Sequence, residues 1–299
     1  MSVNRRDETV RSGDVELAGS WWEPAAPIAT VLMHPGSGPS DRDNETYFPP
    51  IRDHLVAAGI AVVSFDKRGV GGSTGDWRDA GIAEQADDVA AVVSHLAARG
   101  ATSPIGLFGH SQGGWVVVEA ARRTTPAAFV ITNSGPGVPP AIQDRFALER
   151  AAQRAGRDAA ATGLLLRGYD AVTDLLRDGA SLGDAIDRMD TLGLTGDGLN
   201  PLPRLAGDAA SWAAARRVLD HDPQPGLRAL RLPLLAVFGA ADDIVPVAAS
   251  VAAFLDCVDP TLLTVAVLAG GDHRLQRGDP PALVDGYVDT LVRFIATVG

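Results

Sequence analysis

The chain has 299 residues, of which 46% are hydrophobic and 21% charged, as in a folded globular protein rather than a disordered one. Its formal net charge of −11 argues against a nucleic-acid partner and gives no attraction to an anionic membrane. Its single cysteine, Cys257, allows no internal disulfide. The N-terminal residues contain no apolar segment typical of a secretory signal, and no window approaches a transmembrane span. We therefore expect a cytoplasmic protein without a membrane partner.

Short apolar runs alternate with longer helical patterns along most of the chain. After an antiparallel meander near residues 8–24, the apolar runs predict strands at 28–34, 60–65, 105–109, 128–132, 234–239 and 262–268. The stretches between and after them predict helices at 48–58, 82–98, 113–123, 247–258 and 281–298. The strand runs are continuously apolar, which is typical of strands buried on both faces. Strand–helix alternation of this kind predicts an α/β fold with a mostly parallel central sheet flanked by helices.

The alternation stops between about Val138 and Pro223. This stretch is rich in Ala, Arg, Asp and Leu, has helical periodicity, and closes with the breaker-rich segment DHDPQPG. We therefore predict a core domain made of residues 1–137 and 224–299, with residues 138–223 inserted as a helical cap over the carboxyl edge of the sheet. Packing helices without contact to any site are the alternative.

The segment GHSQG at residues 109–113 fits the pattern G-x-S-x-G, and it stands between a predicted strand and a predicted helix. A nucleophile in this position needs strained backbone angles so that its Oγ points away from the sheet, and flanking glycines avoid the resulting clashes. The N–H groups that begin the next helix stabilise negative charge at the same place. Ser111 is therefore the candidate nucleophile.

A serine nucleophile needs a general base, and the base needs an acid that orients it. In a parallel sheet both belong in loops that follow later strands. Asp242 follows the run 234–239, and His273 follows the run 262–268. The chain order Ser111, Asp242, His273 thus predicts a catalytic triad.

With these segments the chain resembles an α/β-hydrolase, over nearly everything except the insertion. The resemblance rests on GHSQGG, GAADDIVP and GGDH, supported upstream by HPGSGPSDRD and DKRGVGGSTGDW. The combination of GSGPSDRD with FDKRG is similar to that of bacterial esterases of the serine-hydrolase branch that carry a helical cap. In this family the acid usually occupies the fourth position of G-x-x-D-x-x-V-P, which is Asp242 here, and Asp243 is the neighbouring alternative.

The resemblance also implies an oxyanion hole. One backbone N–H comes from the residue after the nucleophile, Gln112. The other comes from the loop after the first central strand, where Pro35 cannot donate because it has no N–H. Ser37 is the first candidate for this donor, and Gly36 is the alternative.

Three further residues are candidates for substrate contact. His34 belongs to the predicted oxyanion loop, and His110 flanks the nucleophile. Trp212, in the predicted cap, can form part of an apolar pocket, although core packing is an equal alternative. We expect none of these three to act as the general base, because only His273 has the required position after a strand.

The glycine-rich segment RGVGGSTG fits neither a dinucleotide fingerprint nor a phosphate-binding loop. We expect its neighbours Asp66 and Arg68 to form structural ion pairs that support the site loops. The Asp and His residues lack a tight metal-ligand spacing, so we expect no metal and no cofactor.

The resemblance implies a serine hydrolase that cleaves a small carboxylic ester through an acyl-enzyme intermediate. The same triad can also act on amides, thioesters or lactones, or transfer the acyl group, and fold and triad do not separate these reactions. An alternative of another class is a non-catalytic receptor for a small ligand. A homodimer is compatible with the sequence, but no exposed apolar stripe demands one.

Overall fold

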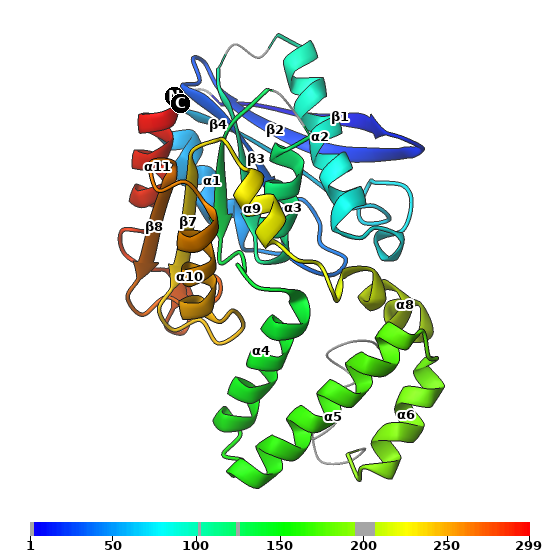
Figure 1. The fold of residues 1–299 in the computed structure, drawn as a ribbon. Helices are drawn as coiled ribbons and strands as arrows, with labels where there is room; N and C mark the ends of the chain where they lie inside the picture. Colours follow the sequence, from blue (N-terminus) through cyan, green and yellow to red (C-terminus); the bar gives the residue numbers. More distant parts are fainter. Residues whose placement is uncertain (1–2, 101–102, 124–125, 195–206) are drawn as a thin grey trace.

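A sheet of eight strands forms the centre of the computed structural model, which describes residues 3–100, 103–123, 126–194 and 207–299 (Figure 1). The strand order is β1-β2-β4-β3-β5-β6-β7-β8. Strand β2 pairs in antiparallel fashion with β1 on one side and with β4 on the other, and all other neighbours in this sheet are parallel. The strands are β1 Val3–Ser12, β2 Val15–Pro24, β3 Ala29–His34, β4 Ile60–Phe65, β5 Ile105–His110, β6 Ala127–Asn133, β7 Leu234–Gly239 and β8 Leu263–Leu268. The mostly parallel sheet and its antiparallel edge are thus confirmed.

Helices cover both faces of the sheet because successive side chains of a strand point to opposite faces. Leu32 belongs to the core on one face, whereas Val31 and Met33 belong to the core on the other. The first face carries α2 (Ile82–Ala98), α3 (Gln112–Ala121), α9 (Gln224–Ala229) and α10 (Val247–Cys257). The second face carries α1 (Phe48–Ala57) and α11 (Tyr287–Val298).

The carboxyl ends of the central strands lie level with one another. His34 of β3 pairs with Gly109 of β5, and His110 pairs with Asn133 of β6. On the other side, Gly239 of β7 pairs with Leu268 of β8. This register brings the loops that follow β3, β5, β7 and β8 to one edge of the sheet, and these loops carry the candidate site residues.

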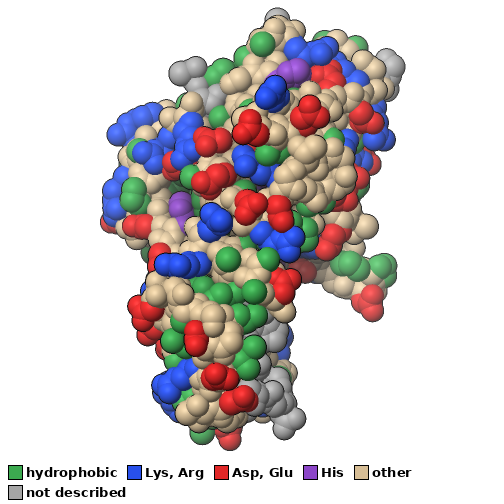
Figure 2. All heavy atoms as spheres, turned by 90° about the vertical axis from the view of Figure 1, so that its right-hand side faces the viewer, with side chains coloured by type: hydrophobic (Ala, Val, Ile, Leu, Met, Phe, Trp, Pro, Cys, Tyr) green, Lys and Arg blue, Asp and Glu red, His purple; other side chains and the backbone are tan. Residues whose placement is uncertain are grey.

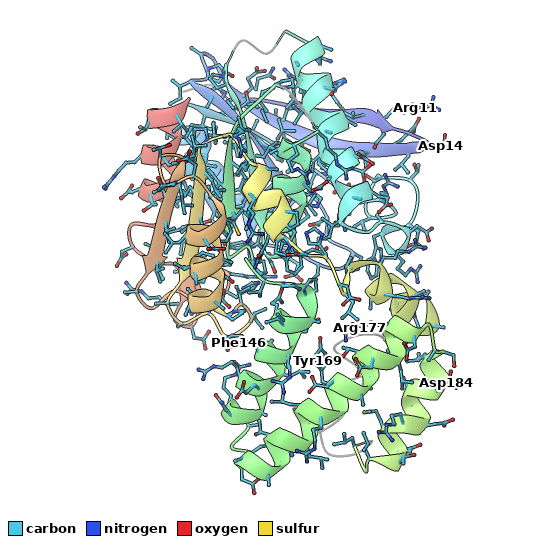
Figure 3. All side chains as sticks on the ribbon, in the orientation of Figure 1. Arg11, Asp14, Phe146, Tyr169, Arg177 and Asp184 are labelled. Atoms are coloured by element: carbon cyan, nitrogen blue, oxygen red, sulfur yellow. The ribbon has the colours of Figure 1, made fainter. Side chains whose placement is uncertain are left out.

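In the described residues between β6 and α9, four helices belong to the insertion, which projects beyond that edge of the sheet (Figure 1). They are α4 (Pro140–Arg154), α5 (Ala159–Asp178), α6 (Leu182–Thr191) and α8 (Ala209–Val218). The insertion has its own small core, which includes Val172 and Met189. Tyr169 of α5 lies toward α4 (Figure 3). Its hydroxyl donates a hydrogen bond to the carbonyl of Ala141 in α4 at 3.2 Å. The predicted boundaries at residues 138 and 223 enclose these helices and stay a prediction.

Two expectations about the last elements are wrong. The helix expected over 281–298 begins only at Tyr287, because Ala282 and Leu283 form a short strand β10 that pairs with β9 (Gln276–Arg277). Gly286, with φ +78°, then turns the chain into α11. The strand at 262–268 is not buried on both faces, since β8 is the edge of the sheet and Val267 is 48% exposed.

Charged side chains of both signs are interspersed over the face shown in Figure 2, so this face offers no extended basic surface. Within the described ranges, none of the helices has the length and the apolar character needed to cross a membrane.

Candidate active site

Ser111 stands on a sharp turn between β5 and α3. Its backbone has φ +54° and ψ −123°, a conformation that costs free energy for any residue with a Cβ. The turn is held by a 2.9 Å hydrogen bond from the Ser111 N–H to the Asn133 carbonyl. A Cβ on Gly109 would lie 2.1 Å from the Gly113 carbonyl oxygen, and a Cβ on Gly113 would lie 2.6 Å from that of His34. The glycines of the motif are therefore required by close backbone contacts.

Asp242 and His273 are joined by a hydrogen bond. The Asp242 Oδ2 accepts it from His273 Nδ1 at 2.9 Å, and Oδ1 accepts the N–H groups of Ile244 and Val245 at 2.8 and 2.9 Å. The Asp242 side chain is fully buried, whereas 17% of the His273 side chain is exposed. Because a carboxylate can only accept, this network assigns the proton of a neutral His273 to Nδ1 and leaves Nε2 as the basic nitrogen.

The structure separates the two candidates for the acid. The carboxylate of Asp243 does not contact His273 but forms an ion pair with Arg154 of α4. Of the two neighbours, only Asp242 is placed to orient the imidazole.

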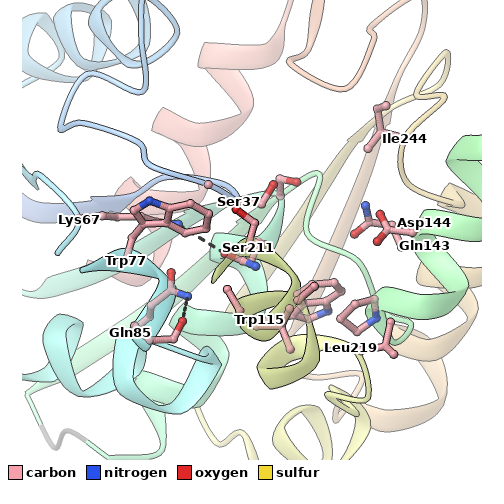
Figure 4. Close-up of a pocket in the computed structure, with 18 of the residues that line it drawn as sticks. Ser37, Lys67, Trp77, Gln85, Trp115, Gln143, Asp144, Ser211, Leu219 and Ile244 are labelled. Atoms are coloured by element: carbon pink, nitrogen blue, oxygen red, sulfur yellow. Dashed lines mark hydrogen bonds between the residues drawn. The ribbon is translucent and has the colours of Figure 1, made fainter. Parts of the chain in front are cut away.

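A cavity of about 560 Å³ lies between the carboxyl edge of the sheet and the insertion (Figure 4). Ser111 and His273 both line it. Within the described parts of the chain, Ser111 Oγ makes no hydrogen bond with His273, as is common before a substrate is bound. Other lining residues come from the loop after β3, from α3, and from α4 and α8 of the insertion, and include Ser37, Gln112, Trp115, Gln143, Asp144 and Ala215.

The predicted oxyanion donors border the same cavity. Gln112 is the first residue of α3, and Ser37 lies in the loop after β3. Within the described ranges, neither backbone N–H donates a hydrogen bond, so both are available to a ligand. Gly36, the alternative, packs directly against the nucleophile: a Cβ there would lie 3.3 Å from that of Ser111.

The three expected substrate-contact residues are placed away from the cavity wall. His110 is buried behind His273, with ring centroids 5.0 Å apart, and its Nδ1 lies 3.0 Å from Asn133 Nδ2. Burial lowers the pKa of His110 well below its ordinary value, so this imidazole is neutral. His34 is also buried, and its Nε2 lies 3.3 Å from Gln85 Oε1.

Trp212 belongs to the core of the insertion rather than to the cavity wall. Its indole N–H donates to the Ala180 carbonyl at 2.8 Å, which fixes the ring inside the insertion. Its neighbours Ser211 and Ala215 line the cavity instead, because they lie on another side of α8.

The residues that follow β4 connect the loops around the site through ion pairs. As expected, Asp66 and Arg68 form ion pairs: Asp66 with Arg42 at 2.7 Å and Arg68 with Asp88 at 2.6 Å. These pairs bind the loops after β3 and β4 and the helix α2 to one another.

Lys67, between them, was missed as a site residue. It is 4% exposed, it lines the cavity, and its Nζ donates to the Gly36 carbonyl and to Gln112 Oε1, the latter at 3.4 Å. Burial lowers the pKa of Lys67 from 10.5 to about 7. The available signal was its position directly after a central strand, where the other site loops also begin.

This fold and this arrangement of loops define an α/β hydrolase. The chain belongs to the Hydrolase_4 family, described as serine aminopeptidase, S33, whose family model matches residues 29–178. No protein with a curated description matches this chain in sequence.

Similar solved structures include esterases and a peptidase. The Pyrococcus furiosus esterase Pf2001 is 18% identical, with a TM-score of 0.63, over 99% of this chain and 94% of that one. A thermophilic esterase from Thermogutta terrifontis is 21% identical, with a TM-score of 0.59, over 99% of both chains. The proline iminopeptidase of Mycobacterium smegmatis is 16% identical, with a TM-score of 0.64, over 98% of both chains. At these identities the likeness establishes the fold alone.

Proposed function

We propose that this hydrolase is a serine esterase that cleaves a carboxylic ester through an acyl-enzyme intermediate. One observation carries the proposal. Ser111, on its strained turn, faces the same cavity as His273, whose imidazole is oriented by the buried carboxylate of Asp242.

In the first half-reaction, the Ser111 Oγ attacks the ester carbonyl while His273 Nε2 takes the hydroxyl proton. The tetrahedral intermediate collapses, the bond to the alcohol oxygen breaks, and His273 returns the proton to the leaving alcohol. In the second, water attacks the acyl-enzyme with His273 again as base, and the acid leaves as Ser111 is restored. Asp242 stabilises the imidazolium in each intermediate.

The N–H groups of Gln112 and Ser37 stabilise the oxyanion of both tetrahedral intermediates. One such donor contributes roughly 3 kcal/mol to the transition state. Because they are backbone groups, one at the start of α3 and one in the loop after β3, they need little reorganisation when the charge forms.

The insertion acts as a cap that selects the substrate. Pro140, Ala215 and Leu219 from the insertion supply apolar lining, while the reacting groups come from the sheet edge. The volume of the cavity suits a small ester, and the two-sided lining limits the access of water during the reaction.

Amide cleavage is a second candidate because of one lining residue. Asp144 of α4 lines the cavity, and its negative charge favours a substrate that carries an ammonium group, such as an amino-terminal residue. We therefore compare p-nitrophenyl butyrate with L-alanine and L-proline p-nitroanilides. A preference for the anilides that Asp144→Asn abolishes supports an aminopeptidase, and a preference for the ester supports an esterase.

The nucleophile itself is tested with a fluorophosphonate probe and mass mapping of the labelled peptide. We expect the adduct on Ser111 in the native protein, none in Ser111→Ala, and very slow labelling in His273→Ala. Ser134→Ala is the matched control, because Ser134 is also buried with a positive φ of +49° but does not line the cavity. A folded native protein that forms no adduct would overturn the proposal and favour a ligand receptor.

A further inference from the structure

The buried ammonium of Lys67 has no role in the reaction described so far. Lys67 is the only lysine of the chain, since all other basic residues outside the six histidines are arginines. In the described part of the chain it forms no ion pair, although Asp66 and Arg68 beside it both do. Burying an unpaired charge costs free energy, and a buried titratable group that lines a cavity is a candidate for a functional role.

The contacts of Lys67 are with the two segments that form the oxyanion hole. Its Nζ donates to the carbonyl of Gly36 and to the side chain of Gln112. The Gly36 carbonyl belongs to the same peptide unit as the Ser37 N–H. This peptide is trans, so its C=O and N–H point in opposite directions, and fixing one fixes the other.

The charge of Lys67 also reaches the place where the oxyanion forms. Gly36 packs against Ser111, and Gln112 follows Ser111 in the chain, so an ammonium bonded to both lies near the nucleophile and lines the same cavity. Lys67 is buried, and a positive charge in such surroundings stabilises nearby negative charge more than it would in water. No carboxylate among the described residues pairs with it and cancels this effect.

We propose that Lys67 is the positioning residue of the oxyanion hole: it fixes the Gly36–Ser37 peptide against the start of α3 and adds its positive charge to the field that stabilises the tetrahedral intermediate. The proposal rests on the proposed function of Ser111. The proposed role and a purely structural role differ in their effect on stability. A structural ammonium stabilises the folded protein, whereas the proposed role of Lys67 stabilises the transition state and lowers the stability of the folded protein.

The variant Lys67→Met tests this, because an unbranched side chain only one atom shorter replaces the lysine and removes both the donor and the charge. With p-nitrophenyl butyrate we expect kcat to fall about 100-fold, which is the effect of removing one oxyanion donor, because the Ser37 N–H is no longer held in position. We expect only a small change in KM. We expect an unchanged or higher Tm. A lower Tm with a proportionate loss of active protein would show a structural role and overturn the proposal.

Transition-state affinity gives an independent readout. A trifluoromethyl ketone adds to Ser111 and places an oxyanion in the hole, whereas the methyl ketone of the same chain binds without adding. In Lys67→Met we expect the affinity for the trifluoromethyl ketone to fall by about the same factor as kcat/KM and that for the methyl ketone to stay unchanged. Equal weakening of both ketones would show ordinary substrate binding and contradict the proposal.

A second variant separates the two contributions. Lys67→Gln keeps an N–H donor for the Gly36 carbonyl but has no charge, so we expect an activity between those of the native protein and Lys67→Met. Fluorophosphonate labelling of the native protein distinguishes a failure of the proposed function from a failure of the proposed role of Lys67. Without labelling of Ser111 the proposed function is wrong, whereas labelling together with full activity of Lys67→Met contradicts only the role of Lys67.

Discussion

Asp242 and Asp243 are adjacent in the chain, yet Asp242 holds His273 by a 2.9 Å hydrogen bond whereas Asp243 pairs with Arg154 of the insertion. The turn after β7 sends one carboxylate into the protein and the other to its surface. Asp242 is buried and accepts two backbone N–H groups, so its position is set by the turn itself.

This difference predicts opposite results for two matched substitutions. Asp242→Asn keeps the shape but offers an amide to His273 Nδ1, which favours the wrong tautomer. We expect kcat/KM to fall by three to four orders of magnitude, on the order seen for such triads. Asp243→Asn is the control, and we expect less than a threefold change. Similar losses in both variants would mean that the acid has been misassigned.

The backbone of Ser111 predicts an unusual order of stabilities. Its φ of +54° is strained for any residue with a Cβ and free for glycine. Among inactive variants, we therefore expect Ser111→Gly to be more stable than Ser111→Ala by about 1 kcal/mol. Denaturant unfolding of the two proteins measures this difference. Equal stabilities would show that the turn relaxes and stores no strain.

The outline of the fold and of this site could be predicted from the sequence for one physical reason. In a parallel sheet the loops after the strands meet at one edge, so strand ends alone bring Ser111, Asp242 and His273 to one place. Two features could not be predicted. The start of α11 depends on the pairing of β10 with β9, and the exposure of β8 depends on the order of the strands in the sheet. Lys67 was missed because its role comes from contacts with Gly36 and Gln112, which lie far from it in the chain.

The pair of Asp66 and Arg42 predicts part of the acid sensitivity of the fold. Burial raises the pKa of Asp66, but hydrogen bonds from the Arg42 side chain and from two backbone N–H groups outweigh it, so the folded pKa lies below the ordinary value of 3.8. The stabilisation is present above pH 3.8 and is lost as the pH falls through the folded pKa.

We therefore expect Asp66→Asn to lower the free energy of unfolding at pH 7 by about 3 kcal/mol, because it removes the buried carboxylate at 2.7 Å and leaves Arg42 with the exposed Asp7 at 3.7 Å. We also expect it to weaken the acid dependence below pH 4. The pair of Asp76 and Arg78 is more exposed, so Asp76→Asn is the control and has a much smaller expected effect. Urea unfolding at several pH values measures both. If Asp66→Asn loses unfolding free energy below pH 4 as steeply as the native protein does, other carboxylates cause this loss.

Lys67 predicts a dependence of stability on alkaline pH, and its sign follows from the direction of its shift. Burial lowers its pKa from 10.5 in the unfolded chain to about 7 in the folded one. Between these values the unfolded state binds the extra proton, so the free energy of unfolding rises with pH in this window. His34, which the Lys67 charge reaches, does not titrate there, because burial lowers its pKa to about 3. The difference in unfolding free energy between Lys67→Met and the native protein should therefore be largest below pH 7 and shrink towards pH 10.

The single lysine makes the same titration directly visible. Protein grown with ¹³Cε-labelled lysine gives one side-chain resonance, which belongs to Lys67. We expect this signal to titrate near pH 7 in the free protein and to stay in the ammonium form to higher pH once the trifluoromethyl ketone has placed an oxyanion beside it, because a nearby anion favours the charged state. A titration near 10.5 in the free protein would mean that the amine is hydrated, and a titration that the ketone leaves unmoved would place it too far from the oxyanion to act on it.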